Sequence, residues 1–186
     1  MPSPTFRTFR SAALAAVLVL ACGGPGAASP ERPLPPYEGH AVELFDDAIE
    51  PRAVGLNLED AADPHTDPML RERTQTGDGV LRVRVDTVTA SGDVETVKYQ
   101  VGLRVVDTLA GEHAPTDSFT VIVDKSSPSL GILKSFDARL GGKTFIAFVK
   151  QFQVGDDRRF QFHFAPDTKE VAAAVKDAVD LGEVQK

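Results

Sequence analysis

Residues 80–90 read VLRVRVDTVTA, and their pattern decides the fold class. Leu81, Val83 and Val85 are apolar, and a charged residue follows each of them. A period of two is typical of a β-strand with one buried face and one face in water. The stretch therefore predicts a long strand at the start of a β-rich region.

Four further segments carry strand patterns, at residues 99–105, 119–123, 143–149 and 160–164. The turn Ser91-Gly92-Asp93 predicts a hairpin between the first strand and the second. Residues 143–149, KTFIAFV, are apolar on both faces, so we expect this strand at the centre of the sheet. These patterns predict a mainly β fold over residues 79–165, either a small OB-like five-stranded barrel or a curled antiparallel sheet.

The C-terminal residues 167–181 predict an amphipathic helix. Asp167 and Glu170 have the spacing of a capping box, and Gly182 is expected to end the helix. The apolar stripe is expected to pack on the barrel, and a partner-binding face is the alternative. Its members are Val171, Ala174, Val175, Ala178 and Val179.

Residues 37–78 form an irregular N-terminal part of the same domain, which we expect to span residues 37–186. Residues 41–45 predict a short strand. Residues 68–75 predict a short helix with Asp67 as its N-cap and Pro68 at the first position.

The first 21 residues have the three parts of an export signal. Arg7 and Arg10 lie near the start without any acidic residue, and residues 11–21, SAALAAVLVLA, form an apolar run that ends just before Cys22. This order is typical of a secretory signal peptide, and the run is shorter than the roughly 20 residues that span a bilayer. Residues 22–36 are rich in Gly, Pro and Ala and predict a tether.

Val19-Leu20-Ala21-Cys22 resembles the lipobox, the cleavage motif of bacterial lipoproteins. The resemblance implies cleavage after Ala21, a diacylglycerol on the Cys22 sulfur, and a further acyl chain such as palmitate on the new amine. The alternative is an ordinary secretory signal with a chance cysteine. Gly23 stands where an aspartate retains enteric lipoproteins at the inner membrane, which favours the outer membrane.

Composition narrows the classes of partner. The chain has a net charge of −7, and removal of Arg7 and Arg10 with the signal would make it −9. Nucleic-acid binders need a basic surface, so we expect no nucleic-acid partner. Cys22 is the only cysteine, so a disulfide within the chain is excluded and the fold must depend on its core.

Residues 79–180 are similar in element order and spacing to netrin-like OB barrels, the fold of the tissue inhibitors of metalloproteases. The similarity lies in the long first strand, the strand at 99–107, a turn with Gly111, and Gly141-Gly142-Lys143 ahead of a Phe-rich strand. It implies a barrel with a C-terminal helix. The disulfides of that family are missing and Cys22 is assigned to lipid, so protease inhibition does not carry over.

No motif of catalysis stands out. Gly142-Lys143-Thr144 resembles the end of a phosphate loop, but Asp137 occupies the place of its first glycine, so we interpret it as a turn. Residues 59–67, EDAADPHTD, hold possible metal ligands, and we interpret them as a solvated acidic loop. His163 alternates with phenylalanines and is interpreted as a surface residue. We expect the clustered phenylalanines to form the core; a groove is the alternative.

The leading hypothesis is a non-enzymatic, lipid-anchored lipoprotein of the cell envelope, without a cofactor or metal. It would act as a binding or accessory subunit of a motility, secretion or transport assembly, with a protein partner and a membrane contact through lipid on Cys22. One alternative is a small-ligand carrier with a groove between barrel and helix. The other is a metal-dependent hydrolase that uses the acidic loop.

Overall fold

The computed structural model describes residues 32–56, 62–93 and 96–184, and its compact unit runs from Pro33 to Lys186. The signal segment, Ala21, Cys22 and most of the tether lie outside the described residues, as do Glu59 and Asp60 of the acidic loop. Within the described ranges, none of the helices reaches the length and hydropathy needed to cross a membrane.

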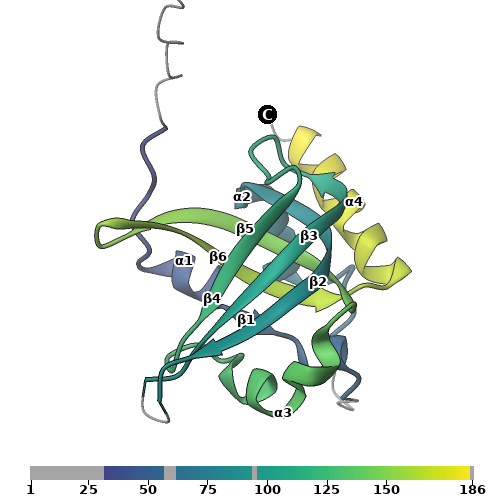
Figure 1. The fold of residues 1–186 in the computed structure, drawn as a ribbon. Coiled ribbons are helices and arrows are strands. Elements are labelled where there is room, and N and C mark those ends of the chain that lie inside the picture. Colours follow the sequence, from purple (N-terminus) through teal and green to yellow (C-terminus); the bar gives the residue numbers. More distant parts are fainter. Residues whose placement is uncertain (1–31, 57–61, 94–95, 185–186) are drawn as a thin grey trace, which may run out of the picture. The chain divides into compact units, whose positions relative to one another are not determined.

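One curled six-stranded sheet forms the body of the molecule (Figure 1). Its strands are β1 (Ala48–Ile49), β2 (Gly79–Ser91), β3 (Lys98–Ala110), β4 (Ser118–Val123), β5 (Thr144–Val154) and β6 (Asp157–Pro166). They lie in the order β1-β6-β5-β2-β3-β4, with β1 parallel to β6 and the other pairs antiparallel. The predicted mainly β, OB-like class is confirmed as a half-barrel, with one strand more than expected.

Strand β2 produces the curl because it pairs on both sides. Strand β2 pairs with β3 from Val80 to Ser91, but only its first part, Gly79–Arg84, pairs with β5. Three register shifts interrupt its pairing with β3, and such bulges bend a strand. At one of them Gly102 faces Thr87, where a Cβ atom would lie 2.4 Å from the threonine Oγ1. The sheet therefore curls back on itself, and β5 and β6 cross behind β2, β3 and β4 (Figure 1).

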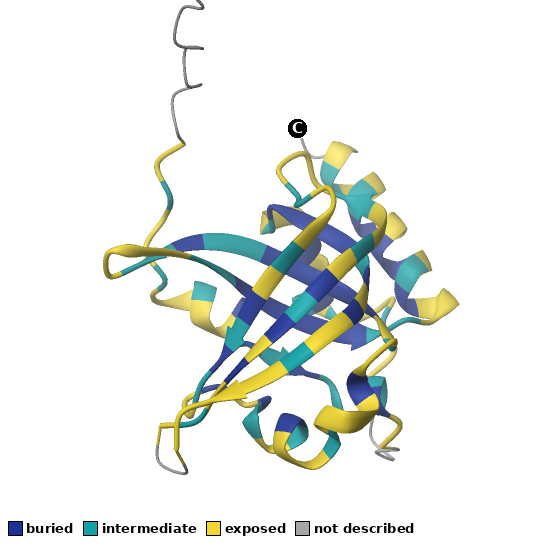
Figure 2. Cartoon of the chain, viewed as in Figure 1, coloured by how far each residue is buried: buried dark blue, intermediate teal, exposed yellow. Residues whose placement is uncertain are grey.

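Strand β5 lies between β2 and β6, as its apolar faces predicted, and its first half is buried (Figure 2). Its two faces belong to two different cores. Phe145, Ala147 and Val149 point into the half-barrel, where Phe162 and Phe164 of β6 join them. Ile146 and Phe148 belong instead to a second core beneath the helices. The predicted role of the phenylalanines as core is confirmed for five of them, which are at most 1% exposed: Phe145, Phe148, Phe152, Phe162 and Phe164.

The helices are α1 (His40–Leu44), the 3-10 helix η1 (Pro51–Val54), α2 (Pro68–Thr76), α3 (Leu130–Leu140) and α4 (Lys169–Val184). The expected helix after Asp67 is confirmed, and the Asp67 carboxylate accepts from the Met69 N–H at 2.9 Å. The predicted strand at 41–45 is wrong, because these residues form α1. Helix α3 was not expected; it closes the base of the half-barrel with Leu133 and Leu140.

Helix α4 packs its apolar stripe on the second core, which confirms the preferred interpretation. Val171, Ala174 and Val175 are buried there. The predicted ends of this helix are wrong. Thr168 lies just before its start and accepts from the Val171 N–H at 3.3 Å, whereas Asp167 accepts from Arg82 at 2.9 Å. Gly182 lies inside the last turn, where helical hydrogen bonding continues to Val184.

Candidate functional site

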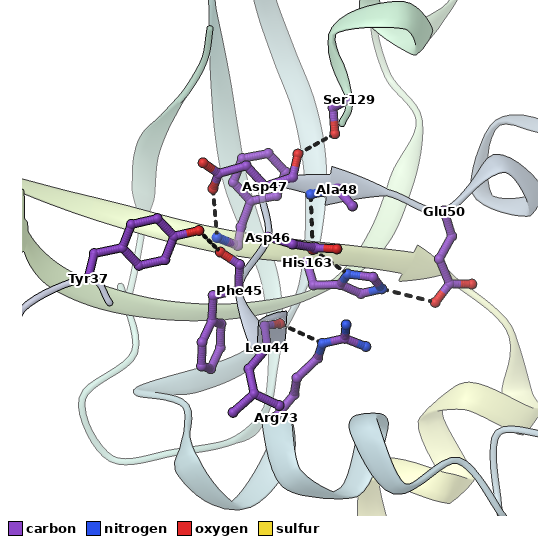
Figure 3. Close-up of polar contacts among 11 residues, drawn as sticks. Tyr37, Leu44, Phe45, Asp46, Asp47, Ala48, Glu50, Arg73, Ser129 and His163 are labelled. Atoms are coloured by element: carbon purple, nitrogen blue, oxygen red, sulfur yellow. Dashed lines mark hydrogen bonds and ion pairs between the residues drawn. The ribbon is translucent and has the colours of Figure 1, made fainter. Parts of the chain in front are cut away.

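Several charged side chains gather where β1 meets β6. The Asp47 N–H donates to the Phe162 carbonyl at 2.9 Å, and the Glu50 N–H donates to the Phe164 carbonyl at 2.8 Å. This short parallel pairing holds residues 46–50 along the edge of β6 (Figure 3). Asp46 and Glu50 thereby reach His163 of β6, Asp47 between them contacts the backbone of Phe162, and Arg73 of α2 lies below. We call these five residues, Asp46, Asp47, Glu50, Arg73 and His163, the β1 cluster.

His163 lies at the centre of the β1 cluster. Its Nδ1 is 2.9 Å from the Asp46 carboxylate and its Nε2 is 3.3 Å from that of Glu50 (Figure 3). Burial opposes protonation of this ring, but the hydrogen bonds to Asp46 and Glu50 outweigh it, so the pKa of His163 is raised. A ring with a carboxylate at each nitrogen satisfies both as an imidazolium. His163 is 7% exposed, so its interpretation as a surface residue is wrong.

Arg73 ties the same segment to α2. Its Nε donates to the Leu44 carbonyl at 2.6 Å, and the side chain is buried. Burial lowers the pKa of Arg73, while the charges of Asp46, Asp67 and Glu50 oppose that change. The guanidinium thus offsets the negative charge of residues 46–50 from the helix side.

Asp47 is held by contacts from β6 and from the residue that precedes α3. Its Oδ1 accepts from the Phe162 N–H at 3.2 Å, and its carbonyl accepts from the Ser129 hydroxyl (Figure 3). When Asp47 is ionised, the swapped orientation of the Gln161 amide lets its nitrogen donate to Oδ1 and Oδ2 at 2.7 and 2.8 Å. The backbone has φ 54°, the left-handed region that aspartate tolerates better than most residues.

The environment of Asp47 disfavours its charged form. Burial raises the pKa of Asp47 to about 8, the Phe162 N–H opposes the shift, and the charges of Asp46 and Asp124 add to it. A carboxyl group that is neutral near pH 7 and borders a pocket is a marker of functional sites, although structural clusters produce the same effect.

A pocket of about 410 Å³ opens beside Asp47, within the range of ligand sites. It lies at the seam, where the free side of β4 approaches β6, and α1 and the loop before α3 complete its wall. Its charged lining residues are Asp46, Asp47, Asp124 and Arg159. The charge of Arg159 favours the ionised forms of Asp47 and Asp124, and its guanidinium donates to Asp157 at 2.8 Å.

A second pocket of about 210 Å³ shares Ile122, Arg159 and Phe160 with the first. Phe119 of β4 also lines it, and its ring lies 5.4 Å from that of Phe160 between centroids. We call the two pockets together the seam groove. One end of the groove holds the Phe119–Phe160 pair with Arg158 and Arg159 beside it, and the other end holds Asp46, Asp47 and Asp124.

The residues considered for catalysis do not meet at this groove. Gly142 and Lys143 form the turn before β5, with φ 78° at Gly142. His65 pairs with Asp177 of α4 at 2.9 Å, far along the chain from the seam. Among the described residues, no group of three or more His, Cys, Asp or Glu side chains is arranged to hold a metal ion.

The sequence analysis missed the charged residues of the β1 cluster other than His163. One signal could have indicated them. Gln161 and His163 occupy alternate positions of a strand rich in phenylalanine, and Asp46-Asp47 follows the apolar pair Leu44-Phe45. Two polar residues on the second face of a core strand require polar partners if that face is covered.

Comparison with known proteins assigns no family to the chain. No protein-family model matches the chain, and no curated protein sequence matches it.

Proposed function

We propose that the chain is a non-enzymatic lipoprotein of the cell envelope that acts as a binding or accessory subunit. The observation that carries the proposal is Cys22, the only cysteine, directly after Val19-Leu20-Ala21 and an apolar run. Thioether-linked diacylglycerol at this sulfur would anchor the protein, because two or more acyl chains hold a protein at a membrane durably. Gly23 favours the outer membrane.

The length between Cys22 and the folded unit supports an anchored domain that reaches a partner near the membrane. Pro33, where the compact unit begins, lies eleven positions after Cys22 in the sequence. A fully extended chain of that length spans about 35–40 Å. The domain would therefore work within one protein diameter or so of the membrane surface.

The seam groove supports a binding role. A groove with an apolar part and a few charged groups is the usual form of a recognition site. The carrier alternative requires space between barrel and helix, whereas the inner face of α4 packs on the second core with Val171 and Val175. We therefore place the binding role at the seam.

The direct experiment is metabolic labelling with a clickable palmitate analogue in a bacterial host. We expect the unaltered chain to incorporate label and fractionate with membranes, and Cys22→Ser to lose both. Gly24→Ala is the matched control, because it leaves the cysteine in place. A labelled, membrane-bound Cys22→Ser chain would refute lipidation.

The role as a subunit needs a second measurement. The tagged, lipidated chain is purified from its own envelope in mild detergent, and co-purifying proteins are identified by mass spectrometry. A reproducible envelope partner is expected. The absence of any reproducible partner would count against the subunit role and for the carrier.

A further inference from the structure

We propose that residues 46–50, which we call the β1 segment, form a pH-sensitive latch that is released from the edge of β6 as the pH rises above neutrality. Release would leave the Phe162 and Phe164 carbonyls without their strand partner and would open the wall of the seam groove that this segment forms. The inference goes beyond the proposed function, because it depends neither on lipidation of Cys22 nor on the identity of a partner.

The β1 segment is held to β6 by a short pairing. Strand β1 has two residues, and the Asp47 and Glu50 N–H groups make its two backbone bonds to β6 at 2.9 and 2.8 Å. The Ser129 hydroxyl donates to the Asp47 carbonyl, and Ile49 is the apolar side chain that the segment buries in the half-barrel core. A pairing of this size can open locally while the longer strands stay paired.

The side chain of His163 joins the β1 segment to β6 through both of its ring nitrogens. An imidazolium ring donates to Asp46 at 2.9 Å and to Glu50 at 3.3 Å at the same time. A neutral ring has a single N–H, so one of the two carboxylates then faces a lone pair. Arg73 of α2 is the cation whose charge opposes protonation of this ring. Loss of the His163 proton therefore weakens both side-chain contacts.

Ionisation of Asp47 acts in the same direction, because it adds a third carboxylate charge to a segment of five residues. The titratable and charged groups that influence it or are influenced by it are Tyr37, Asp46, Asp124 and Arg159. The Phe162 N–H and the Arg159 charge favour the carboxylate, but burial outweighs them. The charged form of Asp47 is thus better accommodated in water than in the closed segment.

The sign of the pH effect follows from the two titrations. The pKa of Asp47 is about 8 in the closed segment and about 4 in water, and the pKa of His163 is raised from its ordinary value of about 6.5. The closed segment therefore binds more protons than the released one, so stability of the closed form is lost as the pH rises. Each group changes the equilibrium by up to about tenfold per pH unit while its two states differ by one proton.

The test is native-state hydrogen exchange of the full-length chain in non-ionic detergent, followed by NMR at pH 6 and pH 8. Each rate is divided by the intrinsic rate at the same pH, which gives the population of the open state. The Asp47 and Glu50 amides report release of the β1 segment. The amides of Leu81 and Ala147, which are buried on β2 and β5, report opening of the sheet.

Three variants separate the latch from a general effect of charge. Asp47→Asn removes one titrating group, and Glu50→Gln removes one of the two carboxylates that favour the imidazolium form of His163. Glu50→Gln also serves if Asp47→Asn fails to fold. Asp180→Asn on the exposed side of α4 makes the same charge change away from the β1 segment.

We expect the open population at Asp47 and Glu50 to rise at least tenfold from pH 6 to pH 8, and to exceed that at Leu81 and Ala147 at least tenfold at pH 8. Asp47→Asn and Glu50→Gln should each reduce the rise, and Asp180→Asn should leave it unchanged. Exchange of the β1 segment only together with the sheet amides would overturn the proposal, as would an open population that does not change with pH or an equal reduction in Asp180→Asn.

Discussion

Two networks of charged side chains in this domain lie in different surroundings, one buried and one exposed to water. The β1 cluster surrounds His163, whose side chain is 9% exposed, between Asp46 and Glu50. The second network lies on the outer face of β2 and β3, where the Arg104 side chain is 57% exposed and meets Asp86 at 2.7 Å. We call this second network, which also includes Arg82, Arg84, Asp107 and Asp167, the surface ladder.

The difference shows that environment, and not distance, decides what an ion pair contributes. The Arg104–Asp86 pair is shorter than either contact of His163. Water screens exposed pairs, which contribute about 0–1 kcal/mol each. A buried charge that loses its partner costs about 3–5 kcal/mol, because it can neither pair nor be hydrated. The β1 cluster should therefore control stability and the surface ladder should not.

Replacement of His163 by alanine should give the largest effect. The change leaves Asp46 and Glu50 with like charges at a covered site and removes the ring that packs 6.4 Å from Phe148. We expect the free energy of unfolding to fall by about 3 kcal/mol, since both carboxylates keep some contact with water. Urea titration at pH 6 measures it. A loss below about 1 kcal/mol would place the cluster in the same class as the surface ladder.

The sequence predicted those strands whose apolar residues follow a regular pattern along the chain. Alternation identified β2 and an unbroken apolar run identified β5, because each pattern extends over five or more residues. Alternation cannot tell whether the second face of a strand is wet or covered, so His163 was misplaced. Its polar partners, Asp46 and Glu50, flank β1, whose two residues are too few to show any period.

The local sequence did not predict helices whose formation depends on tertiary contacts. Residues 41–45 have mixed polarity, and α1 forms because Leu44 and Phe45 bury themselves in the second core. Helix α3 follows Pro128 and contains Gly131, which weakens its helical signal; burial of Leu133 and Leu140 stabilises it. The β1 cluster joins residues more than 110 positions apart, and no local pattern contains that pairing.

The pH dependence of stability tests the β1 cluster a second way. Asp47 has a pKa of about 8 in the folded chain and about 4 when unfolded, so the folded chain keeps a proton that the unfolded chain loses. The stability that this proton on Asp47 gives the folded chain is complete below pH 4 and is lost as the pH rises to 8. His163 acts in the same direction, because its raised pKa gives stability that is lost at high pH.

We therefore expect the free energy of unfolding to fall from pH 6 to pH 8, by about 2 kcal/mol more in the unaltered chain than in Asp47→Asn. Asparagine keeps the acceptor for Phe162 and tolerates the left-handed backbone, and it carries no proton that titrates. Thermal and urea unfolding at both values give the difference. Parallel curves for the two proteins would show that Asp47 does not titrate in this range.

Arg82 should show an intermediate effect, because it links the surface ladder to the chain before α4. Its Nε donates to Asp167, whose side chain is 19% exposed, and its Nη1 donates to Asp107 at 3.3 Å. We expect Arg82→Met, which keeps the apolar stem, to cost about 1 kcal/mol. Asp107→Asn is the control, since it removes only the outer contact. An equal loss in both variants would assign the effect to the ladder as a whole.

The smallest effect is expected for Arg104→Ala. Both groups of the Arg104–Asp86 pair keep water contact, and Arg84 remains 3.4 Å from Asp86 after the change. We expect a change of at most about 0.5 kcal/mol, which 0.5 M salt reduces further because exposed pairs are screened. His163→Ala in the same salt should keep most of its loss. If salt diminished both losses equally, the β1 cluster would be exposed in solution, and the contrast between the two networks would be wrong.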